Sequence, residues 1–322
     1  MRHNKLTRRQ IIKALASVSV GMVAGPLVSC RRAASEVIGP AGIKMQAAII
    51  FEPHIPTALQ RALDYAGDDG FVASMPQLLH ARAHAPYENI IWNTWFTANS
   101  EESVVTTKQG HRVVVAVHGG GIFAHPERFE SSFHADLDRS NSEGITGQSA
   151  AKISELEARD LLDGQLPDGT EIPVFPFDEF KQGIKDLPMR YGVVLDLEMA
   201  RKAKRGYERI DVLRDEPNMI VRAGGVEPLA AYLDRFRDRH NTKLMGNWHP
   251  YNRIDLDQPQ TRVLFLAGNK GGVGTEDEDD YSYGYDAEYG LGGDASMVGM
   301  ARYVAVTPRD VSTSLQNLDF VL

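Results

Sequence analysis

The sequence predicts an α/β fold in which a mixed, mostly parallel sheet is covered by helices on both faces. Three observations predict this fold. Short runs of β-branched and aromatic residues recur along the chain, helical patterns lie between several of them, and some runs are almost continuously apolar. Strands of a parallel sheet have this apolar character because helices bury both of their faces. A distorted α/β barrel is the alternative, but two of the gaps lack a helical pattern, so we favour the open sheet.

The predicted strands are the segments richest in valine, isoleucine and aromatic residues. They span residues 47–52, 89–96, 112–117, 191–197, 219–222, 262–267 and 301–306, with 243–248 as a weaker candidate. The tripeptide Lys108-Gln109-Gly110 predicts a hairpin turn that joins 104–107 to 112–117.

Two helices have clear start signals. Ser154 and Glu157 form a capping-box pattern, and Gly164 provides a stop. Pro228 is tolerated in the first turn of a second helix, which places four apolar side chains on one face, those of Leu229, Tyr232, Leu233 and Phe236. Further helices are predicted over 57–66, 75–84, 126–138 and 177–187.

The first 29 residues are predicted to be a cleaved targeting segment. Five basic residues and no acidic residue precede position 14, and a weakly apolar run then follows over 14–28. A membrane-spanning helix needs about 20 apolar residues, so this run is too short and too rich in glycine to span a bilayer. Residues 7–13, with Arg8 and Arg9 followed by isoleucines and Lys13, resemble the twin-arginine export signal.

Leu27-Val28-Ser29-Cys30 resembles a lipobox, the cleavage and acylation motif of bacterial lipoproteins. The resemblance implies that Cys30 is lipidated and that the protein is anchored in the periplasm, with the twin-arginine translocase and the lipoprotein-processing machinery as partners during export. Arg31 stands where many lipoproteins retained at the inner membrane carry aspartate, which favours the outer membrane. Residues 30–44 are predicted to be a tether, and 45–322 a single α/β domain.

Composition limits the possible partners and metal sites. Removal of residues 1–29 changes the net charge from −8 to about −13, which argues against a nucleic-acid partner. Cys30 is the one cysteine of the chain, so there is no disulfide and no zinc or iron–sulfur site built on thiolates. Any divalent metal would have to be held by histidine, carboxylate or carbonyl oxygen.

A site is predicted where strands end, because polar residues and glycines cluster there and ligands of α/β folds bind beyond the carboxyl ends of the strands. The residues predicted to be catalytic are His118, Asp196, Glu198 and His249. Those predicted to bind substrate or an anion are Gly119, Gly120, Arg222, Gly224, Gly225, Asn247 and Trp248. In this scheme Arg222 clamps a carboxylate or phosphate and the glycines let the ligand approach the backbone.

A divalent metal is a possible cofactor of the same site. Its candidate ligands are Glu52, His54, His118, Asp196 and His249. Equally, paired acids such as Asp196 and Glu198 can perform acid–base chemistry without metal. His80 and His84 have the spacing that places two imidazoles on one helical face, but no third ligand follows them, so an exposed face explains them better.

The run His118-Gly119-Gly120-Gly121 resembles the oxyanion-hole motif of α/β-hydrolase esterases and lipases. The resemblance covers about ten residues and implies that loop N–H groups stabilise an oxyanion. The nearest candidate for the nucleophile is Ser149, in Gly-Gln-Ser-Ala-Ala. This segment departs from Gly-x-Ser-x-Gly, since it ends in alanine and follows a polar stretch rather than a strand.

Residues 269–300 form an acidic stretch rich in glycine and tyrosine, which predicts a long loop that is either a solvated flap or a segment that binds calcium or closes over a substrate. An aromatic set could stack on a flat ligand or a sugar: Trp92, Trp95, Phe96, Trp248 and Tyr251. Trp92 and Trp95 are three residues apart, so on a strand they face opposite sides and at least one belongs to the core.

Three functions follow from these patterns. The first is an exported, lipid-anchored enzyme, hydrolase-like or lyase-like, that acts on a small or oligomeric polar substrate such as an oligosaccharide. The second is a non-catalytic lipoprotein that binds a ligand or assists assembly. The third is an esterase that uses the His118 motif.

Overall fold

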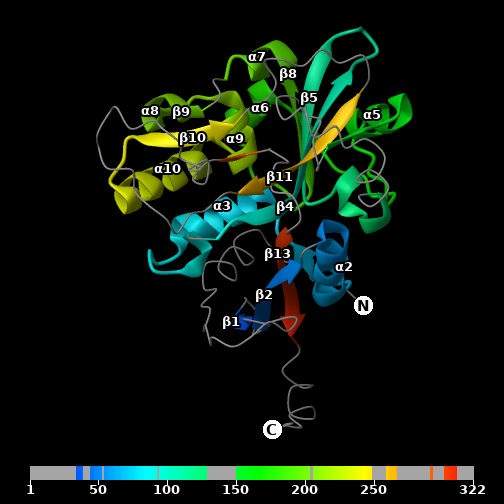
Figure 1. Ribbon diagram of the computed structural model, residues 1–322. Helices are drawn as coiled ribbons and strands as arrows, with labels where there is room; N and C mark the ends of the chain where they lie inside the picture. The colour runs from blue at the N-terminus through cyan, green and yellow to red at the C-terminus, as the bar shows by residue number, and fades with distance from the viewer. Residues whose placement is uncertain are drawn as a thin grey trace.

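The computed structural model describes residues 34–38, 44–52, 54–92, 94–128, 150–203, 206–248, 259–266, 291–292 and 301–309. These residues form a small sheet and a large sheet, with helices packed against both (Figure 1). No helix within these ranges has the length and apolar character needed to cross a bilayer.

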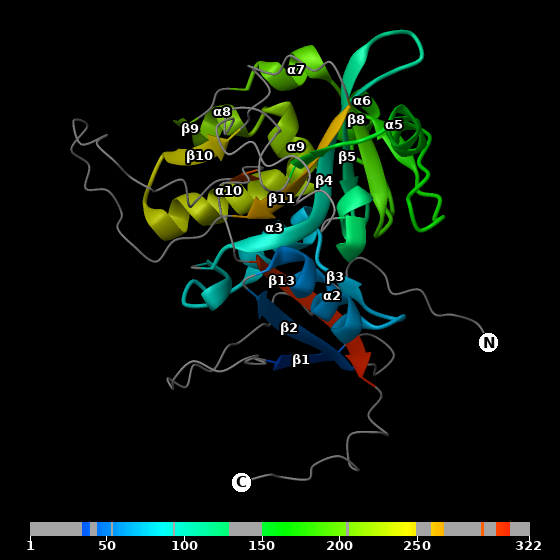
Figure 2. The same ribbon diagram turned by 45° about the vertical axis from the view of Figure 1, so that its right-hand side comes forward.

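The small sheet brings the two ends of the described chain together. Its strand order is β1 (Ala34–Ile38), β2 (Lys44–Glu52), β13 (Ala301–Arg309) and β3 (Phe71–Val72), and every pairing is antiparallel. Helix α2 (Ile55–Ala66) covers one face (Figure 2). Strand β1 falls inside the segment predicted to be a tether, so part of that segment pairs with the domain.

The large sheet runs in the order β7-β8-β5-β4-β11-β12-β10-β9, with β6 added beside β11. Its strands are β4 (Phe96–Thr106), β5 (Arg112–His118), β6 (Ala150–Lys152), β7 (Val174–Pro176), β8 (Tyr191–Asp196), β9 (Gly206–Arg209), β10 (Leu244–Trp248), β11 (Gln260–Leu266) and β12 (Leu291–Gly292). Only β7–β8 and β10–β12 pair in parallel among the described strands.

Helices lie on both sides of the large sheet (Figure 1). Helices α3 (Met75–His84), α9 (Pro217–Ala223) and α10 (Val226–His240) pack on one side, and α5 (Glu155–Leu162) packs on the other. Shorter elements complete the described chain: α6 (Phe177–Lys181), α7 (Leu197–Arg201), α8 (Ile210–Leu213), η2 (Ile90–Trp92) and η3 (Ile122–Ala124). One buried core includes Ala47 and Val304 from the small sheet together with Phe96 and Leu264 from the large sheet.

The predicted mostly parallel sheet is wrong, and so is the barrel alternative. Strand β4 pairs with β5, β5 with β8 and β4 with β11, all antiparallel. Strand β5 is apolar along most of its length because layers cover this antiparallel sheet on both faces, and it is buried from Val113 to His118. Burial on both faces gives the same apolar run in either kind of sheet, so the sequence pattern cannot tell them apart.

Most local elements form where the sequence predicts them. The hairpin at 108–110 joins β4 to β5, and Ser154 caps α5 together with Glu157. The prediction of a strand over 219–222 is wrong, because Glu216 accepts hydrogen bonds from the N–H groups of Asn218 and Met219 and Pro217 occupies the first turn, which together start α9. The strand predicted over 89–96 is also wrong: η2 occupies 90–92, and β4 begins at Phe96. Most of the helix predicted over 126–138 lies outside the described residues.

Candidate functional site

His118, the central residue of the predicted catalytic site, is completely buried at the end of β5. Its Nε2 atom lies 3.1 Å from the carbonyl oxygen of Val221, and its Nδ1 atom lies 2.9 Å from the Ser100 hydroxyl. A carbonyl can only accept, so Nε2 carries the proton and, in the neutral ring, Nδ1 accepts from Ser100. The Ser100 oxygen in turn accepts from the Met75 N–H at 2.9 Å. These contacts give His118 a structural role.

The glycine loop after His118 is turned toward the protein itself. The Gly119 N–H donates to the Asn99 carbonyl at 2.8 Å. The N–H groups of Ile122 and Phe123 donate to the two carboxylate oxygens of Glu101, each at 2.9 Å. An internal carboxylate therefore occupies the position that the esterase hypothesis reserved for a substrate oxyanion. Ser149, the proposed nucleophile, lies outside the described residues.

Burial controls the ionisation of Glu101 and of Glu216. Desolvation raises the pKa of Glu101 to about 7, although hydrogen bonds from Phe123 and Ile122 lower it. Desolvation likewise raises the pKa of Glu216, the cap of α9, to about 7 against hydrogen bonds from Met219 and Asn218. Each carboxyl group has a higher pKa folded than unfolded, so the folded protein binds more protons in this range and its stability falls as pH rises from about 4.5 to about 7.

We expect Glu101→Gln to flatten this pH dependence. Between pH 5 and pH 8, the free energy of unfolding should fall in both proteins, but by up to about 3 kcal/mol more in the wild type. This extra loss comes from the raised pKa of Glu101, which the variant lacks. Urea denaturation of both proteins at the two pH values measures the difference. Comparison with the variant cancels the opposite contribution of His240, whose pKa burial lowers to about 4. Parallel pH profiles for the two proteins would contradict the assignment.

Arg222, the predicted anion clamp, is fully buried on α9. Its Nε and Nη2 atoms lie 2.6 and 2.7 Å from the two oxygens of Glu102. Arg262 Nη2 lies 2.6 Å from one of the same oxygens. Gly224, at φ 82°, ends α9, and Gly225 at φ 132° caps α10. Arg222 therefore belongs to a buried triad with Glu102 and Arg262. The two glycines form the junction between α9 and α10.

Asp196 and Glu198 lie far from His118. In the β5–β8 pair, Asp196 is opposite Val113, whereas His118 is opposite Tyr191. Five residues of strand separate the two positions, or roughly 17 Å. Asp196 caps α7 by accepting from the Met199 N–H at 3.0 Å, and Glu198 pairs with Arg201 at 2.9 Å. The predicted convergence fails because antiparallel neighbours put their carboxyl ends at opposite edges of the sheet.

The remaining predicted residues are dispersed. Glu52 pairs with Arg61, and His54 Nδ1 lies 3.0 Å from the Thr57 hydroxyl at the start of α2. Asn247 and Trp248 belong to β10, where the backbone of Asn247 pairs with Gly206 and Leu291. His249, Tyr251, Cys30 and most of the acidic segment lie outside the described residues.

The geometry does not support the proposed metal site. Over the ranges that the structure describes, no three His, Cys, Asp or Glu side chains stand close enough to hold an ion. The rings of His80 and His84 stack, with centroids 4.0 Å apart, on the exposed part of α3.

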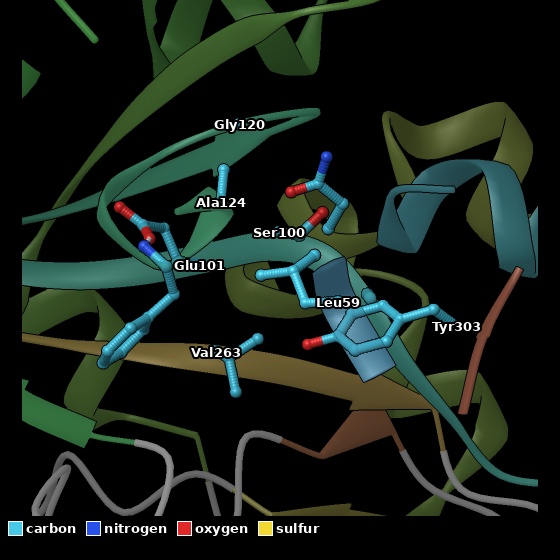
Figure 3. A pocket seen from close by; sticks show the side chains of 10 residues that line it. Leu59, Ser100, Glu101, Gly120, Ala124, Val263 and Tyr303 are labelled. Atoms are coloured by element: carbon cyan, nitrogen blue, oxygen red, sulfur yellow. Dashed lines mark hydrogen bonds between the residues drawn. The ribbon is translucent and has the colours of Figure 1, made fainter. Parts of the chain in front are cut away.

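A narrow hollow lies beneath the glycine loop, between α2, β4, β11 and β13 (Figure 3). Leu59, Glu101, Val263 and Tyr303 line it with neighbouring backbone, and its walls are too close to admit a water molecule. The Tyr303 hydroxyl points into the hollow and has no hydrogen-bond partner within the described chain. The hollow is a tightly packed interior space rather than a ligand pocket.

Sequence reasoning named Trp95 as a possible ligand contact but missed the partly exposed group that it forms with Phe51 and Arg302. The Arg302 guanidinium carbon lies 4.8 Å from the ring centre of Phe51 and 4.7 Å from that of Trp95. Phe51 is 42% exposed, whereas Trp92 and Phe96 are buried. The prediction that at least one of Trp92 and Trp95 belongs to the core is therefore confirmed. The cross-strand pairing of Phe51 with Arg302 joins positions about 250 residues apart, a contact that no local sequence pattern encodes.

Comparison with known proteins identifies a fold but no family. The chain matches no protein-family model, and no curated protein matches it. A solved structure described as "Accommodation of massive sequence variation in Nanoarchaeota by the C-type lectin fold" is similar to 82% of this chain and 98% of its own, with 24% sequence identity and a TM-score of 0.56. At this identity the likeness shows the fold alone.

The likeness to a C-type lectin fold agrees with the antiparallel topology and overturns the predicted helix-covered parallel sheet. The rule that placed a site at the carboxyl ends of the strands applies to open α/β sheets, so it does not apply to this mostly antiparallel sheet. An active site therefore cannot be inferred from where these strands end.

Proposed function

We propose that this chain is a non-catalytic, ligand-binding protein. The observation that carries the proposal is that His118, the central predicted catalytic residue, and Arg222, the predicted anion clamp, have no exposed surface and direct their hydrogen bonds to internal partners. A catalytic or anion-binding group must reach its substrate, and these two side chains cannot. By contrast, Phe51, Trp95 and Arg302 form an accessible group of rings around a cation.

The fold comparison supports binding only in general terms, because a fold does not imply a function. The similar structure is described as a fold that accommodates massive sequence variation. A scaffold that accommodates sequence variation is compatible with recognition of a ligand.

Ligand-induced stabilisation without turnover is the test. The purified domain would be screened by thermal shift against sugars, oligosaccharides and small organic acids, and each mixture would be analysed for product. We expect at least one compound to raise the Tm with no product formed; a ligand at 100 times its Kd adds about 2.7 kcal/mol. Product formation that His118→Ala abolishes, with the Tm unchanged, would restore the enzyme hypothesis.

We propose further that the protein is exported through the twin-arginine route and held in the periplasm by a lipid on Cys30. The support is the sequence of residues 1–30. Cys30→Ala should abolish incorporation of labelled palmitate, and replacement of Arg8 and Arg9 by lysine should leave the precursor in the cytoplasm. Unchanged labelling of Cys30→Ala would exclude the anchor.

A further inference from the structure

Arg302 and Phe51 face each other across the β2–β13 pair of the small sheet. Strand residues alternate between faces. Tyr303 packs in the core beside α2, so its neighbour Arg302 lies on the opposite face of the sheet. Trp95, just before β4, meets Arg302 there. Two strands and the entry to a third thus bring one cation and two rings together.

No acid neutralises Arg302 within the described chain. Alternation puts Glu52 on the α2 side, where it pairs with Arg61. Desolvation is the one cause that shifts the pKa of Arg302, and it lowers that pKa; no neighbouring carboxylate raises it. The guanidinium nevertheless remains charged at neutral pH, because the ordinary pKa of arginine lies far above neutrality. The result is a half-buried positive charge on an acidic protein.

Among the described residues, none accepts a hydrogen bond from the Arg302 side chain. Contact with the aromatic rings uses the faces of the guanidinium plane and leaves its N–H donors for an acceptor. These donors have no side-chain or carbonyl acceptor in the part of the chain that the structure describes. An arginine fork that is partly withdrawn from water and surrounded by aromatic surface binds a carboxylate more strongly than a fully solvated one.

We propose that Arg302, Phe51 and Trp95 form a binding site for a carboxylate carried on a ring, with Arg302 holding the carboxylate and the two aromatic side chains contacting the ring. This inference rests on the proposed ligand-binding function and names its ligand class. Uronic acids of an acidic saccharide and aromatic acids share this chemistry.

The probes that separate the two sources are D-galacturonate and benzoate, with D-galactose and benzamide as their neutral counterparts. We expect at least one acid to bind, measured by titration calorimetry and by quenching of tryptophan fluorescence, and its neutral counterpart to bind at least tenfold more weakly. Galacturonate alone would assign the site to acidic sugars, and benzoate alone to aromatic acids. Equal affinity for an acid and its neutral counterpart would overturn the role of Arg302.

Variants locate the site. Arg302→Gln should weaken binding of the acid at least about tenfold, since a charge-assisted hydrogen bond contributes about 1.5–3 kcal/mol. Trp95→Phe should abolish the change in tryptophan fluorescence, because it removes the indole beside Arg302, while the phenylalanine ring still lies there to contact the ligand. Arg209→Gln is the matched control, because Arg209 is an exposed arginine at the end of β9, in the other sheet, where it pairs with Asp211. Far-ultraviolet circular dichroism and Tm confirm that each variant is folded.

The outcomes for this site and for the proposed function are distinguishable. Full affinity in Arg302→Gln, or binding of neither acid by the wild type, overturns the site. The proposed function survives either result if another compound in the thermal-shift screen stabilises the protein without being consumed. Consumption of a ligand overturns the proposed function even if that ligand depends on Arg302.

Discussion

Glu102→Ala is expected to lower the free energy of unfolding by at least about 3–5 kcal/mol, the cost of removing one partner from a buried ion pair. The effect should be near the upper end, because Glu102 binds two guanidinium groups. Arg222 and Arg262 are each at most 1% exposed, and both lie 2.6 Å from its carboxylate. Without Glu102, the two buried guanidinium groups would lose the carboxylate that they share. Urea denaturation, or loss of soluble expression, measures the result.

The control for this variant is Glu198→Ala. Glu198 also pairs with an arginine, but its side chain is 74% exposed, so the change should cost less than about 1 kcal/mol. A second test is the triple replacement of Glu102, Arg222 and Arg262 by apolar residues of similar volume, which should recover much of the stability lost in Glu102→Ala. Equal losses in Glu102→Ala and Glu198→Ala would contradict the importance of the triad.

Gly121→Ala should be the second most damaging change, at roughly 2–5 kcal/mol. Gly121 has φ 119°, a conformation that disfavours a side chain, and an added Cβ would lie 2.2 Å from the carboxyl carbon of Glu101. Either the carboxylate moves away from the N–H groups of Ile122 and Phe123 or the loop after β5 shifts. Thermal and urea unfolding measure the loss.

Gly110→Ala is the matched control, because Gly110 also has a positive φ, 83°, but open space around it. It should cost about 1–2 kcal/mol, from backbone strain alone. Adding Glu101→Ala to each glycine variant isolates the steric clash: the double mutant with Gly121→Ala should be more stable than additivity predicts, and the one with Gly110→Ala should be additive. Additive behaviour in both pairs would show that Glu101 does not constrain the loop.

Local signals in the sequence were sufficient for most helices and strands. Residues 75–84 form α3 as predicted, and the apolar face of α10, from Leu229 to Phe236, is buried. The failure at 219–222 has a local cause: four apolar residues fit a strand or a buried helix equally well, and the capping by Glu216 decided in favour of the helix.

The candidate site could not be predicted in the same way. His118 and Asp196 lie at strand ends as predicted, whereas Arg222 lies in a helix and not at the end of a strand. The inference that the three side chains meet required parallel strands. In the antiparallel β5–β8 pair, His118 and Asp196 lie at opposite ends. Arg222 instead meets Glu102, 120 residues away, in the interior.

The sequence by itself determined the positions of the hairpin and most helices, and it predicts an export signal and lipid anchor that remain to be tested at the bench. These features depend on residues within a few positions of one another, where propensity and capping act. The tertiary structure alone decided strand direction, the burial of His118 and Arg222, and the meeting of Arg302 with Phe51 and Trp95. Such contacts join distant segments, and an apolar strand has the same sequence pattern whichever way its neighbour runs.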